Sequence, residues 1–363
     1  MISLSWGLGC GVVARERKAT ARVSSRARGM LTPNGWESVM KLSPGNLGHI
    51  NSRRKIAGPE VDRRGALECM IWAGTGVLWT LSGGVPKSLG LLGDALAAEA
   101  SAFTFAHISD SHIGFNKPAN PDALGTLREA IGKVKELKTH PAFMIHTGDI
   151  THLSKPDEFD NADQLIGEAK LDVHYVPGEH DVIDEGLGKA YLARYGKGTK
   201  GSGWYSFDDH GVHFIALVNV IDLKAGGLGR LGPDQLAWFA DDIKDKSDST
   251  PIVVLAHIPL WTVYADWGWG TEDGLQALTQ LKRFGSVTVL NGHIHQIVQK
   301  VEGNMTFHTA RSTGFPQPAP GTAPAPGPMT VPAEQLRSLL GIASVEVRTG
   351  DKPLAITDTP LAG

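Results

Sequence analysis

The sequence predicts an α/β fold with layered sheets. After residue 100, short apolar runs alternate with amphipathic stretches, and this alternation of strands and helices is typical of α/β architecture. The chain has 363 residues, of which 41% are hydrophobic and 20% are charged, so it suits one large or two modest globular domains. Five short polar motifs each follow a predicted strand, where open α/β sheets place their ligands.

The elements expected after residue 100 are eight strands and four helices. The helices are assigned where apolar residues recur at spacings near three and four. The expected strands are 103–108, 142–146, 173–176, 204–207, 212–218, 252–256, 287–290 and 294–301. The expected helices are 122–137, 158–169, 233–244 and 275–284, and residues 342–357 are expected to return as edge strands.

Composition divides the chain into four parts. Residues 1–100 form an N-terminal extension, and residues 101–315 form the folded domain. Residues 316–333 form a Pro-rich loop, because this composition favours a stiff excursion over a packed element. Residues 334–363 are expected to supply C-terminal strands that complete the sheet.

The N-terminal extension is expected to carry a twin-arginine export signal. Arg63 and Arg64 precede an uncharged apolar run, and alanines between Ala95 and Ala100 suit a cleavage site. The run is shorter than the roughly 20 strongly apolar residues of a membrane-spanning helix. We therefore expect the twin-arginine export machinery as a partner. The location is then periplasmic or extracellular, or membrane-anchored if the signal is not cleaved.

Charge and cysteine content narrow the function classes. Residues 1–64 carry a net charge of +8 and the remainder carries −11. An acidic body argues against nucleic acid polymers as partners, because that affinity comes mainly from lysines and arginines. Cys10 and Cys69 both lie in the first seventy residues, so the folded body has no thiolate metal site. Any metal there must be held by histidines and carboxylates.

The five motifs supply three carboxylates and four imidazoles as candidate metal ligands. Mixed oxygen and nitrogen donors suit Zn, Mn or Fe, and seven donors exceed the needs of one ion. Two ions about 3.5–4 Å apart that share a carboxylate generate a bridging hydroxide for in-line displacement at a phosphoryl ester. Any one histidine could be a structural residue, but the ordered set favours a metal centre. The motifs are Asp110-Ser-His112, Gly148-Asp149, Gly178-Glu179-His180-Asp181, Ala256-His257-Ile-Pro259 and Gly292-His293-Ile-His295.

Local spacing is expected to direct these side chains inward. Residues i and i+2 point to one side of an extended segment, so Asp110 can converge with His112, and His293 with His295. Glycines before the acidic or histidine residues allow the tight turns that this requires.

The ordered series DSH, GD, GEHD, AHIP and GHIH resembles the calcineurin-like metallophosphoesterases over residues 103–310. The resemblance implies a four-layer αββα sandwich with a dinuclear metal centre at the strand ends. It implies one ion held by Asp110, His112, Asp149 and His295, and a second held by Asp149, Glu179, His257 and His293, so that Asp149 bridges. His180 matches the histidine that contacts the substrate phosphate, and Asp181 would orient it.

Within the family, the Asp-x-His and Ala-His-x-Pro motifs look most like the bacterial class III cyclic-nucleotide phosphodiesterases. Purple acid phosphatases are less similar, because they have tyrosine where this chain has His152. Glu179 departs from the family pattern, which usually has asparagine. Glutamate adds a negative charge and a methylene, so we expect tighter metal binding and some repulsion of an anionic phosphate. The alternative is that Glu179 points to solvent.

Other residues give weaker signals. An aromatic segment follows His257 and could either line the site or pack as a loop over the sheet edge. Its aromatic residues are Trp261, Tyr264, Trp267 and Trp269. Arg311 is the best-placed basic residue for a phosphate oxygen, and the alternative is a surface arginine.

These features predict an exported hydrolase that uses two divalent or trivalent metal ions. Small phosphodiesters, including cyclic nucleotides or glycerophosphodiesters, are the expected substrates. The alternatives are a phosphomonoesterase and a non-catalytic metal- or ligand-binding protein of the same fold.

Overall fold

The computed structural model describes residues 77–82, 85–90, 103–348 and 354–362. Strands β1 (Val77–Ser82) and β2 (Val85–Gly90) pair in antiparallel fashion, and β1 falls in the apolar run that the sequence assigns to the export signal. The Arg63–Arg64 pair and the alanines at 95–100 lie outside the described residues. Among the helices that are described, none is long and apolar enough to cross a membrane.

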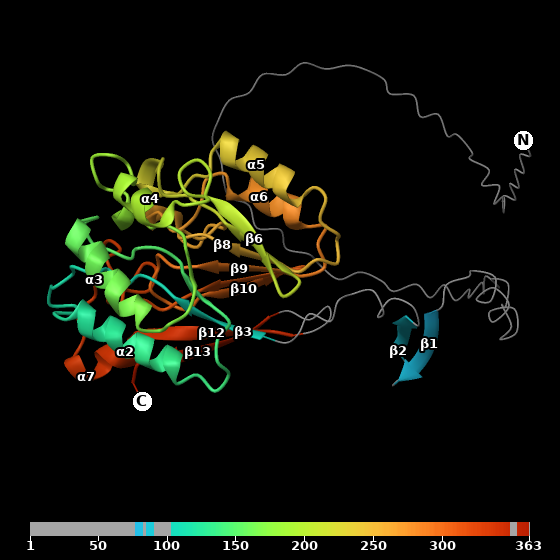
Figure 1. Cartoon of the computed structure of the whole chain (residues 1–363), viewed down its shortest axis with the longest axis horizontal. Helices are drawn as coiled ribbons and strands as arrows, with labels where there is room; N and C mark the ends of the chain where they lie inside the picture. The colour runs from blue at the N-terminus through green and yellow to red at the C-terminus, as the bar shows by residue number, and fades with distance from the viewer. Residues whose placement is uncertain (1–76, 83–84, 91–102, 349–353, 363) are drawn as a thin grey trace, which may run out of the picture. The chain divides into compact units, whose positions relative to one another are not determined.

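One sheet has five strands in the order β13-β12-β3-β4-β5. Its last three strands are parallel, and β12 runs antiparallel to β3 and β13. Helices α2, α3 and α7 bury an apolar cluster against its outer face (Figure 1). The bounds are β3 (Phe103–Ile108), α2 (Ala123–Lys135), β4 (Met144–His146), α3 (Pro156–Gly167), β5 (Val173–Tyr175), α7 (Ala333–Leu339), β12 (Gly341–Val347) and β13 (Ala355–Pro360).

The second sheet has six strands in the order β10-β11-β9-β8-β7-β6. The four central strands are parallel and the two edge strands are antiparallel to their neighbours. Helices α5 and α6 pack on its outer face (Figure 1). The bounds are β6 (Tyr205–Asp209), β7 (Val212–Ala216), α5 (Pro233–Ile243), β8 (Ile252–Leu255), α6 (Gly274–Leu281), β9 (Val287–Asn291), β10 (Gln299–Glu302) and β11 (Met305–Thr309).

An aromatic core joins the two sheets face to face. Phe105 and Phe143 of the five-stranded side stack with ring centroids 5.1 Å apart, and Phe214 of β7 meets the Phe143 ring edge-on at 5.4 Å. Offset and edge-on pairs are the favoured geometries for buried rings. The layers therefore run helix, sheet, sheet, helix, and the predicted four-layer sandwich is confirmed.

The structure departs from the predicted elements mainly after β9. Residues 294–298 do not continue as a strand, because His293 and His295 have φ angles of 70° and 55°, which no strand accepts. Only the end of the expected strand 294–301 is extended, as the start of β10, and the strand β11 that follows was not predicted from the sequence. The sequence analysis also missed helices α4 (Lys189–Tyr195) and α7, which have seven residues each, and the short 3₁₀ turns Glu179–Asp181, Ala225–Gly227 and Ala265–Trp267.

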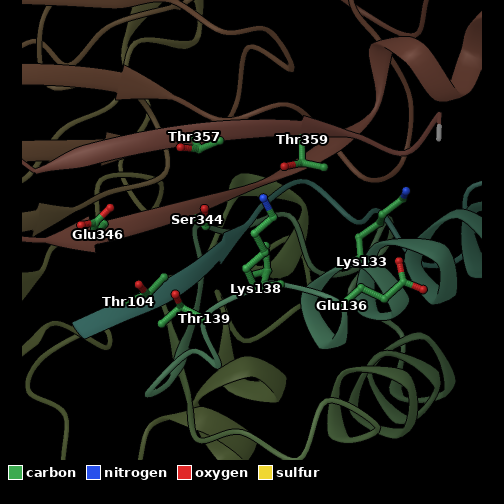
Figure 2. A pocket seen from close by; sticks show the side chains of 10 residues that line it. Thr104, Lys133, Glu136, Lys138, Thr139, Ser344, Glu346, Thr357 and Thr359 are labelled. Carbon is green, nitrogen blue, oxygen red and sulfur yellow. The ribbon is translucent and has the colours of Figure 1, made fainter. Parts of the chain in front are cut away.

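A hollow of about 460 Å³ lies where the C-terminal end of α2 meets the outer face of the five-stranded sheet (Figure 2). Hydroxyl groups of Thr104, Ser344 and Thr359 and the ammonium groups of Lys133 and Lys138 line it. It contains no histidine and no cluster of carboxylates. This hollow therefore lacks the groups that phosphoester chemistry needs, although it is larger than the pocket described next.

Candidate metal centre

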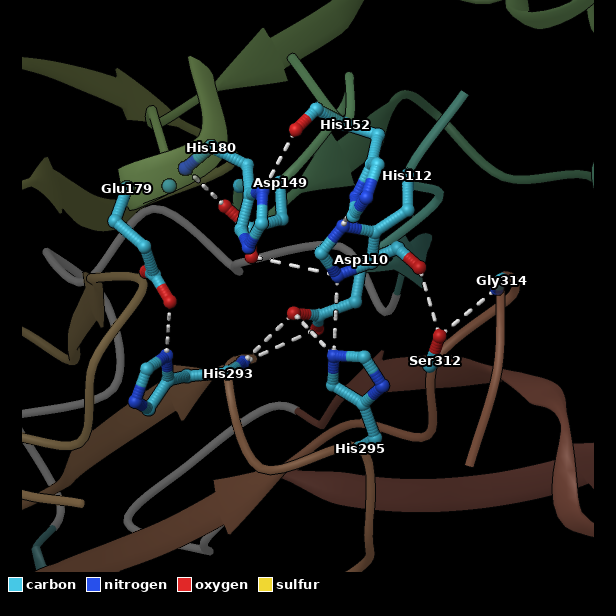
Figure 3. Close-up of polar contacts among 12 residues, drawn as sticks. Asp110, His112, Asp149, His152, Glu179, His180, His293, His295, Ser312 and Gly314 are labelled. Atoms are coloured by element: carbon cyan, nitrogen blue, oxygen red, sulfur yellow. Dashed lines mark hydrogen bonds and ion pairs between the residues drawn. The ribbon is translucent and has the colours of Figure 1, made fainter. Parts of the chain in front are cut away.

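The candidate ligands come from the carboxyl ends of five parallel strands. The loops after β3, β4 and β5 carry Asp110, Asp149 and Glu179, and these strands are neighbours in one sheet. The loops after β8 and β9, which are neighbours in the other sheet, carry His257 and His293. Since parallel strands end at the same edge, the fold brings the motifs together. Figure 3 shows Asp110, Asp149, Glu179 and His293 converging, and His257 lies within 3.5 Å of Asp149 and 2.9 Å of Glu179.

Five candidate ligands have left-handed backbone conformations. Their φ angles lie between 45° and 70°, a region that residues other than glycine rarely adopt. The convergence of neighbouring motif residues therefore arises from tight left-handed turns and not from the extended alternation that the spacing predicts. Such strained residues cluster at functional sites, where the surrounding structure holds them in place. The five are Asp110, His112, Asp149, His293 and His295.

Two glycines are required by close backbone approach at the centre. Gly148 has a φ of 94°, and a Cβ there would lie 2.6 Å from the ring of His257. A Cβ on Gly292 would lie 2.1 Å from Ser109 Oγ and 2.5 Å from a carboxylate oxygen of Asp110. Any side chain at either position would therefore displace a candidate ligand or the residue next to it.

Asp110, His112 and His295 form the first ligand set. Nε2 of His295 lies 3.3 Å from Asp110 Oδ1 and 3.3 Å from His112 Nε2. All three side chains are at most 2% exposed. Two imidazole nitrogens that bind one ion at 2.0–2.1 Å with tetrahedral geometry are roughly 3.3–3.4 Å apart, so this spacing suits a shared ion.

Glu179, His257 and His293 form the second ligand set. Oε2 of Glu179 lies 2.9 Å from His257 Nε2, and Oε1 lies 3.0 Å from His293 Nδ1, as Figure 3 shows for the latter pair. Glu179 therefore points into the centre and not to solvent. Its side chain is 23% exposed and that of His293 is 12% exposed, whereas His257 is fully buried.

Asp149 lies between the two ligand sets. Its Oδ2 is 3.4 Å from His112 Nε2 and 3.5 Å from His257 Nε2. Its other oxygen accepts a hydrogen bond of 2.9 Å from the backbone N–H of His180, which leaves Oδ2 for the centre. One carboxylate oxygen is thus equidistant from a nitrogen of each set, which is the arrangement that a bridging ligand requires.

The polar atoms of the second set are arranged to bind a metal ion and not to form hydrogen bonds with one another. Glu179 Oε2, His257 Nε2 and His293 Nδ1 are buried, and none forms a hydrogen bond with acceptable geometry. Buried polar atoms without partners are rare in proteins and call for a missing ion or water. Several groups of these residues place one donor atom each within 4.8 Å of one another, in keeping with two adjacent cation sites.

Outer hydrogen bonds orient two of the imidazoles. Nδ1 of His257 donates to the carbonyl of Thr147 at 2.6 Å, and Nδ1 of His295 donates to the carbonyl of Phe315 at 2.5 Å. Each bond assigns a proton to Nδ1, so Nε2 is the nitrogen directed at the centre. Partners of this kind fix the tautomer of metal-binding histidines.

The electrostatics of the centre favour charged carboxylates. Burial alone would raise the pKa of Asp110, but His295 and His257 outweigh it and hold that pKa at about 2. Burial also opposes ionisation of Glu179, but the adjacent His293 and His257 hold its pKa well below the ordinary value. Burial keeps the pKa of His112 well below its ordinary value, so this imidazole stays neutral. Ionised carboxylates and neutral imidazoles are the forms that bind metal. Burial would lower the pKa of His257, but Asp149 and Glu179 outweigh it and hold that pKa well above its ordinary value, so His257 must lose a proton when it binds an ion.

His180 faces the same pocket, and a backbone carbonyl orients it. Its Nδ1 donates to the carbonyl of His152 at 2.7 Å, and the His152 ring stacks on it with centroids 4.9 Å apart (Figure 3). Asp181 does not orient His180, contrary to expectation. Its carboxylate instead accepts hydrogen bonds from the backbone N–H groups of Ile150, Thr151 and Gly178 and from the Thr151 hydroxyl. Asp181 thus joins the loops that carry Asp149 and Glu179.

The pocket over the centre has a volume of about 230 Å³. Trp267 and Trp269 line it, whereas Trp261 lines a different hollow with Phe307, and Tyr264 packs against Trp267 at 5.3 Å. The structure does not bring Arg311 to this pocket. The Arg311 guanidinium donates to the carbonyl of Ser338 at 2.5 Å, so the expected phosphate contact is not formed.

The sequence analysis missed the contribution of the Pro-rich segment to the site. Phe315 is 3% exposed, and its ring lies 4.5 Å from the ring of His112 and 4.7 Å from that of His295. Gln317, Pro326, Gly327 and Pro328 also line the pocket. The only signal in the sequence was that the segment follows the last motif closely, because its composition by itself indicates a loop.

Comparisons with known proteins agree with this geometry. Residues 103–297 match the family described as calcineurin-like phosphoesterase, so the chain belongs to that family. It is 24% identical over 220 residues to the glycerophosphodiester phosphodiesterase of Enterobacter lignolyticus, covering 57% of this chain and 76% of that one. It is 23% identical over 227 residues to a 3′,5′-cyclic-nucleotide phosphodiesterase of a Nostoc species, covering 60% and 80%.

A solved structure shares the fold. A dimetal phosphatase from Danio rerio matches 70% of this chain and 98% of its own length, with a TM-score of 0.51 and 13% identity. Fold, family and clustered ligands together define a metallophosphoesterase, a phosphoric ester hydrolase whose family normally binds a dinuclear metal centre.

Proposed function

We propose that this metallophosphoesterase hydrolyses phosphodiesters at a centre of two metal ions. The first ligand set would hold one ion, the second ligand set would hold the other, and Asp149 would be shared. The observation that carries the proposal is the position of Asp149 Oδ2, which is 3.4 Å and 3.5 Å from one histidine nitrogen of each set. When bound, such a pair of ions supplies an activated water and offsets the charge of the phosphoryl oxygens.

The chain's own residues would bind and protonate the substrate. His180 lines the pocket, and its Nδ1 proton is committed to the His152 carbonyl, so Nε2 is the atom free to act on substrate. A proton on Nε2 would pass to the ester oxygen as its bond to phosphorus breaks, while the oxygen of water forms the new bond to phosphorus. The alcohol then leaves neutral. One proton of the water stays on the new phosphoryl hydroxyl group, and the other is released and restores the proton on His180.

The charge of the pocket favours diesters over monoesters. Asp149 and Glu179 line it, and none of its lining residues in the described part of the chain is a lysine or an arginine. A phosphodiester carries one negative charge, whereas a monoester near neutral pH carries close to two. Among its described lining residues, the pocket therefore offers no lysine or arginine to balance the extra charge of a monoester. Two relatives named as phosphodiesterases support the same assignment.

Hydrolysis of matched nitrophenyl esters tests the proposal. The protein loaded with Mn²⁺ should hydrolyse bis-p-nitrophenyl phosphate faster than p-nitrophenyl phosphate, and a chelator should abolish both rates until Mn²⁺ is restored. A faster monoester rate would contradict the diester assignment. Turnover that survives complete removal of metal would contradict the metal mechanism.

We also propose that the chain is exported by a twin-arginine route. Only the sequence supports this: Arg63 and Arg64 precede an uncharged apolar run, and these arginines lie outside the described residues. Replacing both with lysine should trap the precursor inside the cell. Unchanged export of the Arg63→Lys, Arg64→Lys double variant would contradict the proposal.

A further inference from the structure

We propose that the Pro-rich segment, together with Phe315 before it and the tryptophans of the loop between β8 and α6, selects substrates, so that the centre prefers phosphodiesters whose second ester group is flat and apolar over those with a polyhydroxylated group. The inference rests on the proposed diesterase function and names its substrate class. The surface responsible is the apolar wall, which we define as Trp267, Trp269, Phe315, Pro326, Gly327 and Pro328.

Two chemically different groups of residues line the pocket. Candidate ligands and His180 form one group, at which the phosphate would be bound. The apolar wall is the other group, and its aromatic members are firmly packed. Trp267 meets Trp269 edge-on at 5.1 Å, and Phe315 stacks on the ring of His112 at 4.5 Å. An ester group attached to a phosphate in this pocket would therefore lie against rigid apolar groups.

The wall offers little to the hydroxyl groups of a polyol. Its indole N–H groups can donate hydrogen bonds but cannot accept them. The side-chain amide of Gln317 lies next to the wall, and both its nitrogen and its oxygen already form hydrogen bonds. Its Nε2 donates to the carbonyl of His293 at 2.9 Å, and its Oε1 accepts from the N–H of Gly327 at 3.1 Å. Hydroxyl groups that lose their water here would remain partly without hydrogen-bond partners, which costs binding free energy. A flat apolar ring has no hydroxyl group and avoids this cost.

Gln317 is the positioning residue of this wall. Its two hydrogen bonds connect the ligand loop at His293 directly to Gly327, in the middle of the wall. Gln296 reinforces the connection, because its Nε2 donates to the carbonyls of Gln317 and Pro318 at 3.1 Å and 2.7 Å. Side-chain amides and a backbone hydrogen bond of 2.8 Å from the N–H of Met329 to the carbonyl of Pro316 therefore hold Pro326–Pro328 in place, without a helix or a strand.

Diesters that share one leaving group isolate the effect of the wall. We would compare p-nitrophenyl phenyl, p-nitrophenyl methyl and p-nitrophenyl glyceryl phosphate, because they carry the same charge and release the same p-nitrophenolate. The Mn²⁺-loaded protein should show a kcat/KM for the phenyl ester about tenfold or more above that for the glyceryl ester, a difference of the size that pocket contacts supply. Calorimetric titration should likewise show tighter binding of diphenyl phosphate than of dimethyl phosphate.

Four variants separate the wall from general damage. Trp267→Ala and Gln317→Ala should lower the phenyl-to-glyceryl ratio toward one while metal content, measured by elemental analysis, stays at the wild-type value. Trp267→Phe should retain the ratio because it retains a flat ring. Gln335→Ala, which changes an exposed glutamine of α7 outside the pocket, should leave ratio and metal content unchanged.

The outcomes distinguish this inference from the function on which it rests. If the metal-loaded protein hydrolysed none of the three diesters, the proposed function would be overturned and the inference with it. Hydrolysis without a preference for the phenyl ester would overturn the inference alone. A wild-type preference that survives both Trp267→Ala and Gln317→Ala with bound metal would also overturn it, since the wall would then not be its source.

Discussion

The two ligand sets of the metal centre are built in different ways. The three side chains of the first set are at most 2% exposed, and all three residues have left-handed backbones. In the second set, Glu179 and His293 are partly exposed to the pocket, and neither His257 nor Glu179 has a positive φ. The backbone therefore fixes the positions of the ligands in the first set. The second set depends instead on Glu179, whose side chain is longer and has more rotatable bonds.

Glu179 also changes the charge balance between the sets. With glutamate in place of the family's usual asparagine, each set has one carboxylate and two imidazoles and shares Asp149 with the other. The two sets therefore carry similar charge, although they differ in backbone conformation and in exposure. We expect the first ion to be retained because of geometry, and the second to be retained because of charge.

Loss of the shared ligand should have the largest effect, since both sets depend on it. Asp149→Asn should remove both ions and lower the rate of diester hydrolysis to that of the metal-free protein, by more than about 10²-fold. Elemental analysis and kcat/KM would be measured together. Asp245→Asn, on an exposed residue of the same type, should change neither. Two bound ions with full activity in Asp149→Asn would eliminate the shared-ligand assignment.

Loss of His180 should reduce turnover without affecting either set. Because its Nδ1 bonds to a carbonyl and its Nε2 faces the pocket, His180→Ala should retain both ions and lower kcat by about 10²–10⁴-fold. His140→Ala, at an exposed histidine, is the matched control. Loss of an ion from His180→Ala would show that His180 is a ligand and would break the division into two sets.

Exchange of Glu179 should affect only the second set. Glu179→Asn should weaken retention of one ion by about 10–100-fold, yet raise turnover when metal is supplied in excess, because the ion then pulls more strongly on the phosphate. Glu179→Gln keeps the length of the side chain and removes its charge. It therefore separates the effect of side-chain length from the effect of charge. Metal titration of each variant gives the affinities. Equal affinity in wild type and both variants would show that Glu179 binds no ion.

Truncation of Arg311 should have the smallest effect. Its guanidinium bonds to Ser338 and not to the pocket, so Arg311→Ala should leave metal content and kcat/KM unchanged. Loss of that hydrogen bond should lower the free energy of unfolding by about 0.5–1.5 kcal/mol. Denaturant titration checks the stability, and a large rise in KM would restore the phosphate-binding role that the sequence predicts.

Local signals in the sequence predicted the α/β layers and the convergence of the motifs, whereas the four-layer sandwich and the division of the ligands into two sets were implied by the resemblance to the family. Each motif follows an apolar run, and parallel strands end at a common edge, so Asp110 and His295 meet although 185 positions separate them in the chain. The left-handed turns were not predictable from spacing. Aspartate and histidine adopt positive φ more often than most other non-glycine residues, but this preference is too weak to locate a turn, because tertiary contacts impose the strain.

The missed details share a different cause. Asp181 follows His180 directly, which suggested a pair, but a 3₁₀ turn points its carboxylate at the N–H groups of residues 150, 151 and 178. Arg311 was placed by order along the chain alone. The wall was missed because proline-rich composition indicates the absence of helix and strand, yet it does not say where side-chain amides such as Gln317 will anchor the loop.

The location of bound ions tests the central claim most directly. Crystals grown with Mn²⁺ would be measured at a wavelength where manganese scatters anomalously. We predict two anomalous peaks, one within each ligand set, on either side of Asp149 Oδ2. A single peak at the first set, with Glu179 bonded directly to His257 and His293, would contradict the account of a dinuclear centre.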